Sequence, residues 1–186
     1  MATTTDTNTP AEFKRFDIPL KWGLILGLLS CALFTIQNLY LVSNLMVYFA
    51  SLALSFIITM ALLCMVGVKQ RRAMGGYITL KDAFQAIFVA ILVILVITTA
   101  YSYIYLHFID PDFPVRMKEA TLNFTERMGG SQANLDEASR KFDEQMAKRN
   151  QIGTQIFSFF WSIVIYGFFG FICALIVKKN KPEFGA

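Results

Sequence analysis

The sequence predicts an all-α membrane protein: a four-helix transmembrane bundle with an extramembrane amphipathic helical hairpin between spans three and four. Three observations predict this fold. Hydrophobic residues make up 55% of the 186 residues and charged residues only 16%, against ~25% charged in a typical soluble domain. Three long runs contain no Asp, Glu, Lys or Arg. These runs are continuously apolar rather than alternating, which favours helices over the strands of a barrel.

The charge-free runs set the number of spans. They cover 22–68, 83–109 and 150–177, with 47, 27 and 28 residues. Because a helix of ~20 residues crosses the hydrocarbon core, the second and third runs hold one span each. The first run must fold back, and its Gln and Asn residues indicate a turn at 37–44. One membrane domain over 16–180 is therefore expected, with spans near 20–40, 45–68, 82–108 and 152–177.

Basic residues predict the orientation, because they concentrate on the cytoplasmic side of a membrane. The loop between spans three and four has seven basic residues against eight acids, so it should lie outside. Both termini should then be cytoplasmic, with a disordered tail at 1–15 and a short tail at 181–186. The ten basic residues on the cytoplasmic side are Lys14, Arg15, Lys21, Lys69, Arg71, Arg72, Lys81, Lys178, Lys179 and Lys181.

The first span is expected to be an uncleaved helix. Residues 28–31 resemble a lipoprotein cleavage box, but the chain stays apolar beyond Cys31, where a cleaved protein should turn polar. Small residues at Gly23 and Gly27, and again at Gly167 and Gly170, are typical of closely packed membrane helices. They are expected to close the bundle, with dimerisation as the alternative.

Two extramembrane segments carry helix signals. Thr79 and Asp82 form a capping-box pattern at the start of span three. In the predicted hairpin at 112–150, Gly129-Gly130 separates two helices, and Asn134 should cap the second one. The two apolar stripes should face each other or the membrane; a partner-binding groove is the alternative. The stripes are Phe113, Met117, Ala120, Phe124 and Met128, then Leu135, Ala138, Phe142 and Met146.

No catalytic, metal-binding or cofactor-binding residue is predicted. No Asp, Glu, Lys or Arg lies in the middle of a span, and such groups usually mark ion paths. His107 and Asp110 should share a helix face, but a lone His lacks the ligand set that zinc requires. The three cysteines are expected to pack as small apolar residues. A modest polar face is formed by Thr98, Thr99, Ser102, Ser158 and Ser162.

Two stretches carry a resemblance to a known family: GGYITLKDAF at 75–84 and YIYLHFIDPDF at 103–113, together with the basic tail after Val177. With the four-span layout, the chain resembles the domain of unknown function 4199 family over roughly residues 16–180. The resemblance implies a bacterial multi-pass membrane protein. The expected location is therefore the inner membrane, with the hairpin in the periplasm. The family resemblance implies no reaction and no functional residues.

The expected function is structural or partner-recruiting, without catalytic activity. One alternative is a small channel or permease component that acts as an oligomer, which would use the polar face of spans three and four. A weaker alternative is a lipid-modifying enzyme, for which only His107 and Asp110 offer suitable groups. The expected partners are the lipid bilayer and either a second copy or another membrane protein. A nucleic-acid partner is not expected.

Overall fold

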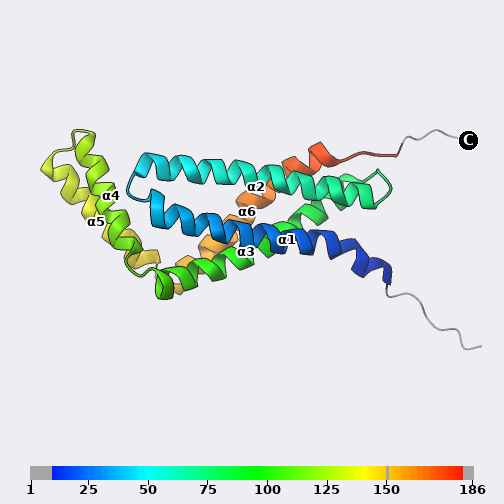
Figure 1. Ribbon diagram of the computed structural model, residues 1–186, viewed down its shortest axis with the longest axis horizontal. Coiled ribbons are helices and arrows are strands. Elements are labelled where there is room, and N and C mark those ends of the chain that lie inside the picture. Colours follow the sequence, from blue (N-terminus) through cyan, green and yellow to red (C-terminus); the bar gives the residue numbers. More distant parts are fainter. Residues whose placement is uncertain (1–9, 150, 182–186) are drawn as a thin grey trace, which may run out of the picture.

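The computed structural model of the chain describes residues 10–149 and 151–181. These residues form α-helices joined by short loops, and two five-residue π-helical turns, η1 and η2, extend α1 and α3 (Figure 1). The predicted all-α bundle is confirmed. The elements are α1 Pro10–Ile36, η1 Gln37–Leu41, α2 Leu45–Ala73, α3 Leu80–Ile104, η2 Tyr105–Ile109, α4 Phe113–Arg127, α5 Gln132–Arg149 and α6 Ile152–Val177.

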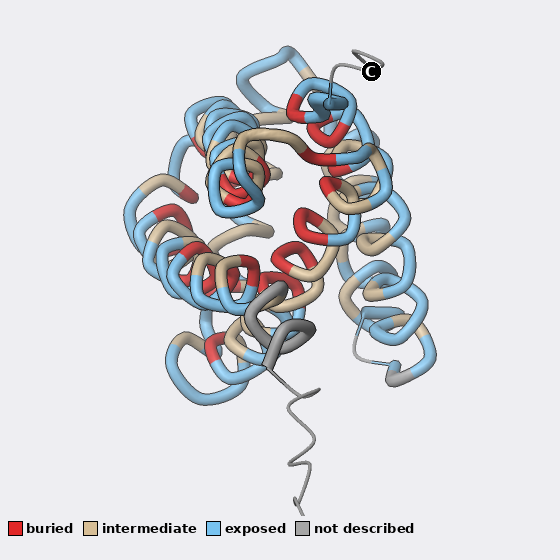
Figure 2. Tube along the Cα trace, turned by 90° about the vertical axis from the view of Figure 1, so that its right-hand side faces the viewer, coloured by how far each residue is buried: buried red, intermediate tan, exposed pale blue. Residues whose placement is uncertain are grey.

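Four helical segments are long and apolar enough to cross a membrane, as predicted: Phe16–Leu41, Leu45–Ala73, Leu80–Ile109 and Gly153–Val177. Their buried residues face the bundle axis and their exposed residues point outwards (Figure 2). Most exposed large apolar side chains lie on these spans, as expected for a surface that faces lipid. In the tail predicted at 1–15, residues 1–9 lie outside the described residues, and α1 begins at Pro10. Of the short tail, 182–186 also lie outside them.

Helix α3 contacts each of the other three spans. The predicted glycine faces of α1 and α6 both lie against it. A Cβ added at Gly23 would come 2.9 Å from the Cβ of Val93, and one added at Gly170 would come 2.6 Å from Cδ1 of Ile91. These glycines therefore close the bundle within one chain, because only a missing side chain allows such a close approach.

One end of the bundle, here called the tail end, holds the α2–α3 loop and the C-terminal end of α6. Ile78 and Lys179 exchange two backbone hydrogen bonds of 2.9 and 3.0 Å. Arg71 donates to the carbonyl oxygen of Val177 at 3.0 Å. The predicted cap of α3 is present, since the Thr79 hydroxyl accepts from the Asp82 amide at 3.2 Å. These contacts join three helix ends.

The opposite end, the hairpin end, carries α4 and α5, which project beyond the spans (Figure 1). The two helices pack together, with Phe124 and Phe142 half-buried. The predicted cap at Asn134 is wrong. Gly129, with a φ of +80°, ends α4 at once, so α5 begins a turn earlier and the Ser131 carbonyl accepts from the Asn134 amide at 2.9 Å.

Candidate functional site: a polar cavity between α3 and α6

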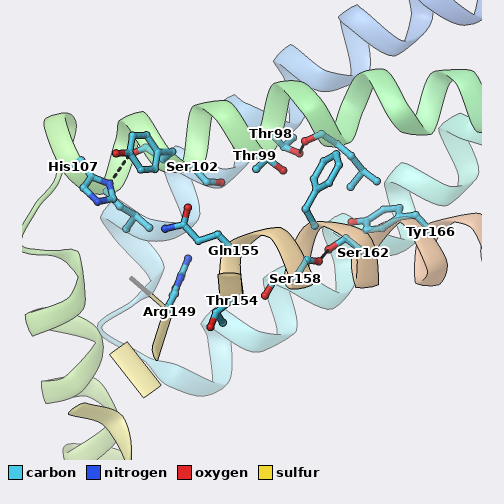
Figure 3. A pocket seen from close by; sticks show the side chains of 14 residues that line it. Thr98, Thr99, Ser102, His107, Arg149, Thr154, Gln155, Ser158, Ser162 and Tyr166 are labelled. Atoms are coloured by element: carbon cyan, nitrogen blue, oxygen red, sulfur yellow. Dashed lines mark hydrogen bonds between the residues drawn. The ribbon is translucent and has the colours of Figure 1, made fainter. Parts of the chain in front are cut away.

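The hairpin half of the bundle contains a cavity of about 340 Å³ between α3–η2 and α6 (Figure 3). Its volume lies within the ~300–1,000 Å³ range of small-molecule sites. Thr99, Gln155 and Ser158 are exposed, so the cavity is open to the surroundings. The lining residues are Leu95, Thr98, Thr99, Ser102, Tyr103, Leu106, His107, Arg149, Thr154, Gln155, Ser158, Phe159, Ser162 and Tyr166.

Helical spacing places the hydroxyls of each wall on one face. On α6, Thr154, Ser158, Ser162 and Tyr166 recur every four residues, which aligns their side chains along the helix. Ser102 lies four residues after Thr98 on α3, and Figure 3 shows the two rows facing each other. A polar strip thus lies between two otherwise apolar spans.

All five hydroxyl residues of the predicted polar face line this one cavity. Sequence reasoning missed Arg149, Thr154, Gln155 and Tyr166, which line it as well. The four-residue repeat that begins at Thr154 was a usable signal. Arg149 carried no comparable signal, because it resembled the other charges of the hairpin.

At the end of the cavity away from the hairpin, here called its deep end, two hydroxyls are already engaged with their own helices. Thr98 donates to the carbonyl oxygen of Ile94 at 2.8 Å, and Ser162 donates to that of Ser158 at 2.8 Å. A hydroxyl that donates in this way keeps its oxygen lone pairs as acceptors. The deep part of the cavity therefore offers acceptors to a ligand.

The end of the cavity nearest the hairpin, here called its mouth, contains one permanent cation, Arg149. Arg149 lies there at the end of α5, beside the start of α6, and His107 lies across from it on η2 (Figure 3). The His107 ring stacks on Tyr103 with centroids 4.3 Å apart, and its Nδ1 lies 2.9 Å from the Tyr103 carbonyl oxygen. Among the described lining residues there is no carboxylate. The mouth therefore favours an anion.

The structure separates the two residues of the predicted His107–Asp110 pair. Asp110 accepts a hydrogen bond of 2.9 Å from the Tyr105 hydroxyl and forms an ion pair with Arg116 of α4. The π-helical turn η2 ends before Asp110, whose φ of −141° takes the chain out of the helix. Asp110 thus joins α3 to α4, whereas His107 belongs to the cavity.

A second cavity of about 200 Å³ lies among α1, α2, α3 and α6, and it shares Leu95, Thr98, Ser102 and Tyr166 with the first. Gln37 lines it and donates from Nε2 to the Ser55 hydroxyl at 2.6 Å. The polar interior therefore continues from the α3–α6 cavity towards the bundle axis.

The turn predicted at 37–44 is only partly present. Residues 37–41 form η1, and the turn follows at 42–44. Gln37 and Asn38 are buried, and Asn38 accepts from the Tyr48 hydroxyl at 3.0 Å. The two residues that were predicted to form a loop instead make polar contacts inside the bundle. The reason is that the α-helix passes into a π-helical turn, which keeps these side chains pointing inwards.

The described part of the chain contains no group of three or more His, Cys, Asp or Glu side chains that could hold a metal ion. Cys31, Cys64 and Cys173 are free thiols; Cys31 and Cys173 are buried, and Cys64 is half-buried. Cys173 contacts the Met60 carbonyl oxygen at 3.7 Å, a weak hydrogen bond between α6 and α2. The thiols lie within the helix packing.

The fold and the cavity define a multi-pass α-helical membrane protein with a polar cavity in one half of its bundle. Residues 21–179 match the family described as protein of unknown function (DUF4199), and the chain belongs to that family. This match confirms the resemblance drawn from 75–84 and 103–113. Neither the curated proteins nor the solved structures contain a significant match to the chain.

Proposed function

We propose that the protein is a non-catalytic membrane protein that binds a small polar ligand between α3 and α6, as one component of a membrane assembly. The observation that carries the proposal is the convergence of hydroxyls from two spans on one open cavity. Polar side chains inside a membrane are expensive unless they serve structure or function. Thr98 and Ser162 donate to carbonyl oxygens of their own helices and not across to the other helix. This arrangement favours a ligand between the two rows.

The tail half of the bundle supports binding rather than conduction by a single chain. Leu63, Val66, Ala83, Ile87 and Ala90 are almost completely buried there, within one apolar core. This apolar core lies between the cavity and the tail end. The channel or permease alternative therefore requires several copies, or a movement that opens the core.

The non-catalytic part of the proposal is supported by the way the reactive groups are occupied. His107 lies against Tyr103, Asp110 binds Tyr105 and Arg116, and the two deep hydroxyls donate to helix carbonyls. A general base must reach the proton that it removes. The lipid-modifying alternative has no such pair among the contacts described for the cavity.

Cysteine protection tests ligand binding. In a chain whose three cysteines are replaced by alanine, Ser158→Cys places a thiol in the cavity and Phe157→Cys places one on the outer face of the same helix. A membrane extract should slow maleimide labelling of Ser158→Cys and leave Phe157→Cys unchanged. Equal labelling of both, with or without extract, contradicts the proposal.

A second role, recruitment of a membrane-protein partner or a second copy, is supported by the hairpin. Helices α4 and α5 are joined by an ion pair of 2.7 Å between Lys118 and Asp143 and extend beyond the spans (Figure 1). Cross-linking from Glu126→Cys at the exposed end of α4 should capture a partner in native membranes. A chain that remains uncross-linked and monomeric removes support for this role.

We further propose that the protein lies in the bacterial inner membrane with both termini cytoplasmic. The α2–α3 loop and the end of α6 lie together at the tail end, and the predicted basic residues flank that end. A reporter that is active only in the periplasm should work when fused after Gly130 and fail after Ala186. The reverse pattern contradicts the orientation.

A further inference from the structure

We propose that the α3–α6 cavity binds a phosphate ester that carries free hydroxyl groups, with the phosphate near Arg149 and the hydroxyls along the facing Ser and Thr side chains of α3 and α6. This inference rests on the proposed function and names its ligand class. Two sources share this chemistry: a soluble polyol phosphate and the headgroup of a glycerol-type phospholipid that enters between the two helices.

The charge of the cavity favours the phosphate. The described lining holds the permanent cation of Arg149 and no Asp or Glu. The ion pairs of α5 are Lys118–Asp143, Arg140–Glu144 and Lys141–Glu137, and Arg149 forms none with the described residues. An arginine without a carboxylate partner presents a planar fork of donors that matches two phosphate oxygens.

The neighbours of Arg149 add donors to the same end. Gln155 and Thr154 lie in the first turn of α6, beside Arg149 in Figure 3. The amide nitrogen of Gln155 and the hydroxyl of Thr154 can each donate a hydrogen bond. A phosphate at the mouth would thus meet a cation and two neutral donors from one short stretch of chain.

The deep end favours hydroxyls on the ligand. Thr98 and Ser162 have already used their hydrogens on backbone carbonyl oxygens, at 2.8 Å in each case. Their oxygens can only accept, so they pair best with a ligand that donates. Ser102 lies five residue steps from His107, or ~7.5 Å at 1.5 Å per residue, so a glycerol phosphate held at the mouth reaches the first hydroxyls of the two rows.

The order of these groups also argues against a simple cation site. Hydroxyl and carbonyl oxygens can bind an alkali ion, but such an ion would enter past a guanidinium that repels it. A choline headgroup would meet the same repulsion, and the described lining offers its cation no carboxylate. Glycerol-type and choline-type lipids should therefore differ in binding.

Binding to the purified full-length chain in detergent tests the proposal. The probes are glycerol 3-phosphate, inorganic phosphate, short-chain phosphatidylglycerol and short-chain phosphatidylcholine. Arg149→Gln should weaken binding of the phosphate esters at least tenfold. The matched control Arg140→Gln, on the same helix but paired with Glu144, should change it less than twofold. Both variants should elute as single peaks with unchanged melting temperatures.

The hydroxyl rows have their own test. Ser102→Ala combined with Ser158→Ala should weaken glycerol 3-phosphate at least fivefold and leave inorganic phosphate within twofold. Binding of phosphatidylglycerol without glycerol 3-phosphate assigns the ligand to the lipid. Tight binding of glycerol 3-phosphate assigns it to the soluble ester.

Three results overturn the inference: no phosphate probe binds, Arg149→Gln has no effect, or phosphatidylcholine binds as well as phosphatidylglycerol. The labelling of Ser158→Cys distinguishes a wrong ligand class from a wrong proposed function. If a membrane extract protects this thiol while all phosphate probes fail, only the ligand class is wrong. If neither extract nor probe protects it, both proposals fall.

Discussion

The two halves of the bundle use the same helices in opposite ways. In the tail half, glycines at 23, 67 and 170 bring the helices so close that an added Cβ would meet a neighbouring atom within 2.6–3.0 Å. In the hairpin half, the helices leave two cavities lined by hydroxyl and amide groups. One half is closely packed and mostly apolar, and the other contains cavities with polar walls.

This difference indicates where stability and function lie. Lipid tails are as apolar as the helix surfaces, so close van der Waals packing holds membrane helices together. The hairpin half gives up some of that packing. It replaces it with isolated polar contacts, such as that of Asn38 with the Tyr48 hydroxyl at 3.0 Å. We infer that the tail half supports the site in the hairpin half.

The largest expected effect is on the tail half. Gly23→Val should lower the free energy of unfolding by about 3 kcal/mol, because its Cβ would lie 2.9 Å from Val93 Cβ and 3.2 Å from the rigid Ala90 carbonyl oxygen. The control is Gly153→Val, where a Cβ meets nothing within 4 Å. Unfolding in mixed detergent micelles measures both. Equal small losses for Gly23→Val and Gly153→Val would show that α1 does not pack closely against α3.

A smaller loss is expected at a buried polar contact of the hairpin half. Tyr48→Phe should cost about 2 kcal/mol, since it leaves the buried side-chain Oδ1 of Asn38 without its donor. Adding Asn38→Leu should restore part of the loss, because both polar groups are then gone. The same unfolding assay applies, and strictly additive losses would contradict the coupling.

The ion pair of the hairpin should contribute less. Lys118 and Asp143 are 29% and 62% exposed, so Lys118→Gln should cost about 0.5 kcal/mol, an effect that fades in high salt. Thermal unfolding at low and high salt measures it. A loss above ~2 kcal/mol would mean that the hairpin depends on this pair more than exposed pairs allow.

The smallest effect on stability is expected inside the cavity. Thr98→Val should change the free energy of unfolding by less than ~0.5 kcal/mol, because the hydroxyl donates only to carbonyls of its own helix. A loss as large as that of Tyr48→Phe would indicate that the cavity wall is structural. That result would weaken the contrast between the two halves.

Much of the fold was predictable, because span number depends on the length of charge-free runs and each run is visible in the chain. The glycine faces at Gly23 and Gly170 were predictable for a similar reason, since small residues at helical spacing have few other uses in membranes. The cap at Asn134 was not predictable. The turn at Gly129 ends α4, so that α5 already begins directly after Ser131.

The cavity was predictable only in part. Thr98 and Ser162 were visible as polar residues of their spans, but how each helix is rotated about its own axis depends on packing. Sequence spacing does not report that rotation across a bundle. Gln37 and Asn38 were misread for the same reason: they resemble a turn until a π-helical segment directs them inwards.

The bridge between Ile78 and Lys179 has a consequence for biosynthesis. The ribosome makes α1, α2 and α3 long before residue 179 emerges. The face of α3 around Ile87 and Ile91 therefore lacks its α6 neighbour until α6 is inserted. Once α6 is inserted, pairing at Lys179 joins the newest segment to the loop that precedes α3. Assembly should therefore finish at the tail end, and a chain stalled before residue 177 should display the unoccupied α3 face to membrane quality-control proteases.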